Sequence, residues 1–92
     1  MAEVAFEVLV TGRVQGVWFR QSTCDQARVE GVLGWVRNLP DGNVAAWLQG
    51  EDAAVERLHD WLHSGPPQAR VDEVRAQARR PDPDLESFEI RD

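Results

Sequence analysis

The sequence contains no lysine, no tyrosine and only one cysteine. Every basic side chain is an arginine, and the excess of acidic residues gives a formal net charge of −6. Nucleic-acid phosphates are bound through surfaces of clustered Lys and Arg. The acidic balance therefore argues against a nucleic-acid-binding protein, and any anion site must be local, built from a loop and one or two arginines.

The single cysteine, Cys24, excludes an intrachain disulfide and favours a reducing compartment. No apolar run approaches the length of a membrane span, and the N-terminus reads as the start of a strand, not as a signal peptide. We therefore expect a soluble, cytoplasmic protein that does not bind membranes. Its 92 residues suffice for a single domain over residues 1–92, with one sheet and a pair of helices.

The most informative segment that is present is a loop bracketed by two glycines, which reads GRVQGVWFR over residues 12–20. The segment before it alternates as a half-buried strand does, with an apolar face formed by Val4, Phe6, Val8 and Val10. A helix-compatible segment follows. Such a turn can direct backbone N–H groups, a helix dipole and Arg20 toward one small volume, which suits a phosphate. The glycine spacing alone fits a plain strand-to-helix turn equally well.

Periodicity and turn residues predict the remaining elements. We expect a helix over residues 19–30 that Gly31 ends, a hairpin of strands 33–38 and 44–48, and a second helix over 51–63. A strand near 69–71, a turn at 79–84 and a last strand around Phe88 and Ile90 follow. The order βαββαβ, with the fourth strand either continuous or split in two, predicts an α+β fold. Both helices should cover one face of a mainly antiparallel sheet of four to five strands.

This topology also predicts a meeting of distant residues. Two strands joined by a crossover helix run parallel, so their carboxyl ends lie at the same edge of the sheet. The loop from Gly12 to Trp18 and the side chain of Asn38 should therefore emerge on the same side.

The run GRVQGVWFR, Thr23 in the next helix, GWVRN over residues 34–38 and GPPQARV over residues 65–71 together resemble acylphosphatases. The blocks span nearly the whole chain in the family's order, and the distances between them also fit. The resemblance implies a ferredoxin-like α/β sandwich and a small hydrolase of acyl phosphates that uses no metal or other cofactor. By position, the family's substrate-binding arginine falls on Arg20 and its catalytic asparagine on Asn38.

The chemistry of this reaction explains why the expected site needs neither histidine nor carboxylate. An acyl phosphate releases a carboxylate whose conjugate acid has a pKa of about 4, so no general acid is required at neutral pH. Phosphoryl transfer depends mostly on positioning and on charge stabilisation. We expect Asn38 to orient the attacking water and the phosphoryl oxygens to be bound by the loop residues Gln15, Gly16, Val17, Trp18, Phe19 and Arg20. The expected partners are a small acyl phosphate and phosphate or other anions, and we expect a monomer.

Several other residues invite functional hypotheses that we do not favour. His59 and His63 lie one helical turn apart and flank Asp60, but they lie off the apolar stripe, so we expect no metal site. Cys24 is expected to be half-buried in its helix and not a nucleophile. Trp35, Trp47 and Trp61 are expected in the core or on the sheet, whereas Trp18 can form a wall of the pocket.

Two other functional classes stay open at this point. A ferredoxin-like module can bind a phosphorylated ligand in a regulatory role without turning it over, although Asn38 speaks against mere binding. A nucleic-acid module that uses the sheet face is the remaining alternative. The acidic balance and the lack of clustered basic and aromatic motifs disfavour it.

Overall fold

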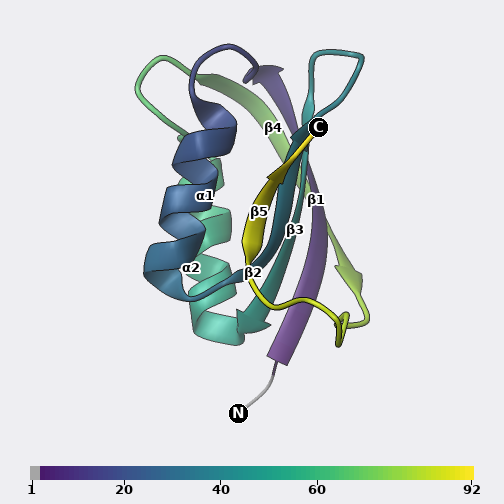
Figure 1. Ribbon diagram of the computed structural model, residues 1–92. Helices are drawn as coiled ribbons and strands as arrows, with labels where there is room; N and C mark the ends of the chain where they lie inside the picture. Colours follow the sequence, from purple (N-terminus) through teal and green to yellow (C-terminus); the bar gives the residue numbers. More distant parts are fainter. Residues whose placement is uncertain (1–2) are drawn as a thin grey trace.

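The computed structural model describes residues 3–92, which form one five-stranded sheet with two helices on one of its faces (Figure 1). This is the predicted ferredoxin-like α+β sandwich. Along the chain the elements are β1 (Glu3–Arg13), α1 (Phe19–Glu30), β2 (Leu33–Asn38), β3 (Val44–Glu51), α2 (Asp52–Leu62), β4 (Arg70–Arg79) and β5 (Phe88–Arg91). Within residues 3–92, no helix is long and apolar enough to cross a membrane.

The sheet has the order β4-β1-β3-β2-β5, so β1 and β2 flank the same strand. Both pair with β3 in antiparallel register and therefore run parallel to each other. Val44 at the start of β3 is the register partner of Val10 on one side and of Asn38 on the other. The predicted meeting of the two carboxyl ends is confirmed. In Figure 1 the β1–α1 loop, the β2–β3 turn and the C-terminus all lie at one end of the molecule.

The core lies between the helices and the covered face of the sheet. Helix α1 has the predicted bounds, and Gly31 ends it in the left-handed conformation (φ 74°). Its buried face consists of Phe19, Thr23, Cys24 and Ala27, and that of α2 of Ala54, Val55, Leu58 and Leu62. These faces pack against sheet residues that include Val8, Val10, Val36, Val44, Ala46, Leu48 and Phe88.

The expectation that Cys24 is half-buried was wrong, because its side chain is almost fully buried (1% exposed). Its Sγ donates a hydrogen bond to the carbonyl oxygen of Phe88 at 3.6 Å. Strand β5 covers this part of α1, and the sequence pattern of α1 alone does not reveal that neighbour.

The C-terminal third of the chain forms two separate strands on opposite edges of the sheet. Strand β4 pairs with β1, whereas β5 runs parallel to β2. The chain between them is fixed to the helix-free face of the sheet, where the Gln49 side chain exchanges two hydrogen bonds with the backbone of Asp82 (2.8 and 2.9 Å). The split fourth strand was one of the two predicted alternatives.

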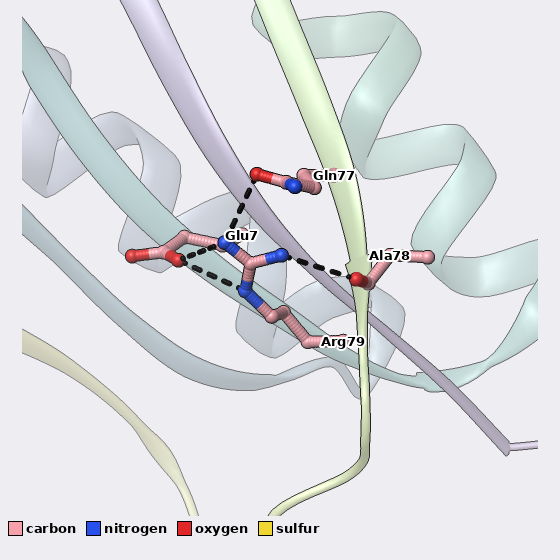
Figure 2. A network of polar contacts seen from close by, with 4 residues as sticks. All are labelled: Glu7, Gln77, Ala78 and Arg79. Carbon is pink, nitrogen blue, oxygen red and sulfur yellow. Dashed lines mark hydrogen bonds and ion pairs between the residues drawn. The ribbon is translucent and has the colours of Figure 1, made fainter.

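Strand β4 is longer than the segment predicted near residues 69–71, and its far end is fixed by Arg79 (Figure 2). The guanidinium of Arg79 forms an ion pair with Glu7 of β1 at 3.1 Å. It also donates to the side chain of Gln77 and to the carbonyl oxygen of Ala78. This exposed network joins the edge strand to its neighbour.

Candidate active site

Near the end of β1, just before the β1–α1 loop, lies a glycine that no other residue can replace without a clash. Gly12 has φ +126°, and a Cβ there would meet the backbone carbonyl of Arg70 on β4. The register between β1 and β4 shifts between Thr11 and Gly12. After this shift Gly12 and Arg13 still pair with Val71 and Arg70 of β4, and the chain then leaves the sheet for the loop.

The loop ends at Trp18, the residue that caps the N-terminus of α1. Its backbone is left-handed (φ 65°, ψ 20°), and it is the only non-glycine residue with positive φ among residues 3–92. The Trp18 carbonyl accepts the hydrogen bond of Ser22 N–H at 2.9 Å, which starts the helix. The unpaired N–H groups of the first turn, and the positive end of the helix dipole, therefore lie next to the loop.

Arg20 lies in this first turn and is anchored by the C-terminal segment. Its Nη1 donates to the carbonyl oxygen of Arg91 at 3.2 Å and lies 3.8 Å from the Asp92 carboxylate. The side chain is one-third exposed. The remaining guanidinium N–H groups make no hydrogen bond within residues 3–92 and are available to an anion.

Asn38 closes β2 on the other side of the site. Its carboxamide Oδ1 is buried and has no hydrogen-bond partner within the described part of the chain. Buried polar atoms are paired in the great majority of cases. The other buried side-chain atom without a partner in residues 3–92 is Oγ1 of Thr23 in α1. The Oδ1 end of the carboxamide is thus not engaged by another protein group.

These elements enclose a cavity of about 440 Å³ at the carboxyl end of β1 and β2. Among the predicted site residues, it brings together Gly16, Trp18, Phe19, Arg20 and Asn38. Its other lining residues, Val14, Gln21 and Ile90, were missed by sequence reasoning. Val14 and Gln21 are sequence neighbours of the predicted loop, but only the parallel pairing of β5 with β2 brings Ile90 to the site. None of the lining residues is a histidine or a carboxylate, so the polar part of the cavity wall offers positive charge and amide groups.

Two predicted loop residues, Gln15 and Val17, do not line the cavity with their side chains. Val17 is buried in the core (4% exposed). Gln15 instead joins the loop to the β2–β3 turn, because its Nε2 donates to the carbonyl oxygens of Leu39 at 2.7 Å and Asn43 at 2.8 Å. Leu39 directly follows Asn38, so this side chain couples the loop to the strand end that carries the asparagine.

The histidine pair on α2 lies outside this cavity. Ligand atoms of His59, Asp60 and His63 lie within 4.8 Å of one another, and Asp60 and His63 are exposed. Burial is the main cause of a lowered pKa of His59, and the neighbouring His63 lowers that pKa further. None of the three residues contributes to the wall beside Arg20 and Asn38.

Comparison with known proteins is consistent with this geometry. The family model for acylphosphatase matches residues 6–90. An acylphosphatase from Anaeromyxobacter dehalogenans is 57% identical over 88 residues, which are 96% of this chain and 95% of the relative. Another from Nitrosococcus oceani is 54% identical, covering 90% of this chain and 92% of the relative. The structure of an acylphosphatase from Coxiella burnetii is similar with a TM-score of 0.92 at 38% identity, covering 97% of this chain and 93% of that one.

Proposed function

We infer the mechanism from the premise that this chain belongs to the acylphosphatase family, whose enzymes hydrolyse acyl phosphates to a carboxylate and inorganic phosphate. We propose that the reaction takes place in the cavity between the β1–α1 loop and the end of β2. The observation that carries the proposal is the convergence of Arg20 and Asn38, from different elements, on one cavity.

In this proposal the phosphoryl group binds against the loop. Backbone N–H groups of residues 15–20 and the free guanidinium donors of Arg20 bind its oxygens, with the dipole of α1 adding to the attraction for a negative charge. The transition state of phosphoryl transfer spreads charge over the equatorial oxygens, where these donors act. This arrangement supplies the positive charge from the protein itself.

The role proposed for Asn38 is to orient the attacking water in line with the bond that breaks. A carboxamide is not a strong base, so Asn38 positions the water and does not remove its proton. The bond between water oxygen and phosphorus forms while the bond between phosphorus and the carboxylate oxygen breaks, and the proton that the water loses passes to an oxygen of the phosphoryl group. The leaving carboxylate departs without protonation because its conjugate acid has a pKa of about 4.

We also propose that residues 1–92 act as a single domain and as a monomer in the cytoplasm. The five strands form one sheet, and the core closes within one chain. The only cysteine is buried and unpaired, which suits a reducing compartment.

The test is phosphate release from benzoyl phosphate in the presence of a chelator, with a phosphomonoester as the control substrate. We expect hydrolysis of benzoyl phosphate only, unaffected by the chelator. In Asn38→Ala, turnover should fall about 10²- to 10³-fold, the usual cost of losing a group that orients or stabilises the reacting atoms. Inhibition by inorganic phosphate should change little.

Full activity of Asn38→Ala would refute the role of Asn38. Tight phosphate binding by the wild type without any turnover would support the alternative, a binding module. Loss of activity on chelation would refute the metal-independent mechanism.

A further inference from the structure

Two apolar side chains are exposed at the wall of the cavity. Among residues 3–92 the exposed large hydrophobic side chains are Trp18 (77%), Val29 (79%) and Ile90 (40%). Trp18 and Ile90 both line the cavity, although one directly precedes α1 and the other lies in β5. A single exposed apolar residue is ordinary, but two from distant segments at one cavity form a surface suited to an apolar group.

The backbone conformation of Trp18 is a second indication that its indole has a function. A left-handed residue is accommodated best by glycine or asparagine, and a bulky side chain disfavours this conformation. The turn itself gains nothing from tryptophan, and the side chain contributes little to the core because it is mostly exposed. Strained residues of this kind concentrate at ligand sites, where the side chain has a function.

We propose that Trp18 and Ile90 form a subsite for the acyl group, and that the preferred substrates carry an aromatic or large aliphatic acyl chain. This inference rests on the proposed function, because the phosphoryl end must first be bound at Arg20 and the loop. In-line attack places the leaving acyl group on the opposite side of phosphorus from the water. The acyl group therefore lies against cavity walls other than Asn38.

The side chains that line the cavity support separate places for the phosphoryl group and the acyl group. Its polar groups belong to Arg20, Gln21 and Asn38, whereas the side chains of Val14, Phe19, Trp18 and Ile90 are apolar. Of these four, Val14 and Phe19 are only 1% exposed, so Trp18 and Ile90 offer most of the apolar contact area. A planar acyl group can stack on the indole of Trp18, whereas an acetyl group is too small to cover it.

The experiment compares kcat/KM for benzoyl phosphate with kcat/KM for acetyl phosphate in the wild type, Trp18→Gly, Ile90→Ala and Val29→Ala. Glycine adopts the left-handed conformation readily, so Trp18→Gly removes the indole without straining the turn. The ratio of the two substrates cancels any loss that both share. Val29→Ala is the matched control, since Val29 is about as exposed as Trp18 and lies in α1 but does not line the cavity.

We expect the benzoyl to acetyl ratio to fall about three- to tenfold in Trp18→Gly, the size of an aromatic stacking contribution. A smaller fall is expected in Ile90→Ala, and none in Val29→Ala. An unchanged ratio in Trp18→Gly, or an equal fall in Val29→Ala, would overturn the subsite. Failure of the wild type to hydrolyse either acyl phosphate would instead refute the proposed function, so the two failures are distinguishable.

Discussion

At the scale of single residues, the two central side chains of the site are held in different ways. Arg20 is anchored through Nη1 by the carbonyl oxygen of Arg91, which leaves its other donors to an anion. Asn38 is fixed by its place at the end of β2, while its Oδ1 has no partner in residues 3–92. In the proposed mechanism Arg20 binds the negative charge and Asn38, which lines the same cavity, positions the water.

The first prediction concerns Arg20. Replacement by alanine should weaken competitive inhibition by inorganic phosphate about 10- to 100-fold, because hydrogen bonds to charged groups are the stronger ones. Arg20→Lys should retain part of the affinity, since it keeps the charge but loses the planar fork. The inhibition constant for phosphate is the measurement.

Arg13→Ala serves as the control for this prediction. Arg13 is an exposed arginine at the end of β1, directly before the same loop, and it does not line the cavity. Its replacement should leave the inhibition constant nearly unchanged. If Arg13→Ala and Arg20→Ala weakened phosphate binding equally, the effect would reflect general charge and not a specific contact.

At the scale of elements, the site depends on how the β1–α1 loop and the β2–β3 hairpin are joined. The Gln15 amide bridges them by donating to two backbone carbonyls of the hairpin turn. In the proposed mechanism the loop binds the phosphoryl group and the hairpin carries Asn38. We therefore expect Gln15 to act as a positioning residue that sets the distance between the two.

The next prediction follows from this bridge. Gln15→Ala should lower kcat about 10- to 100-fold, because small displacements of positioning groups have large kinetic effects. Gln15→Glu should be worse, since a carboxylate cannot donate and would face two carbonyl oxygens. Measurements of kcat and of the phosphate inhibition constant should separate an effect on turnover from an effect on phosphate binding. We expect kcat to change more.

Gln77→Ala is the matched control, because Gln77 is an exposed glutamine of β4 that does not line the cavity. Its kinetic constants should equal those of the wild type. Wild-type kcat in Gln15→Ala would show that the bridge does not position the loop.

At the scale of the whole molecule, α2 contributes to pH-dependent stability through His59. Burial and the neighbouring His63 lower the pKa of His59 in the folded state, while Asp60 and Glu56 partly oppose this. In the unfolded chain the pKa is about 6.5. Below that pH the unfolded chain binds more protons, so this contribution to stability is present above about pH 6.5 and is lost as the pH falls through the folded pKa.

We therefore expect the free energy of unfolding of His59→Gln to fall less between pH 7 and about pH 5 than that of the wild type. Urea denaturation at a series of pH values measures this, and the titration of carboxylates cancels in the difference between the two proteins. His63→Gln is the comparison variant. It removes the smaller cause of the lowered pKa of His59 and leaves burial, the main cause, so it should keep most of the pH dependence. Identical pH profiles of His59→Gln and the wild type would contradict the assignment.

The accuracy of the sequence predictions varies with how local the signal is. The bounds of α1 were predicted correctly because its apolar spacing and Gly31 are local signals. Strand β4 was predicted too short, since most of its residues are exposed and it shows little alternation. Ile90 was placed in a strand but not in the site, because its position depends on pairing with Val36, more than fifty residues earlier in the chain.

The sequence by itself determined the order of the elements, the glycine turn and the candidate roles of Arg20 and Asn38. Periodicity, turn chemistry and the family's motifs each depend on residues that are close in the sequence. Only the tertiary structure decided that Gln15 faces the hairpin, that Cys24 is buried beneath β5, and that Ile90 reaches the cavity. Each of these contacts joins segments at least 24 residues apart. Strand register and the packing of α1 set them, and both arise only when the whole sheet has formed.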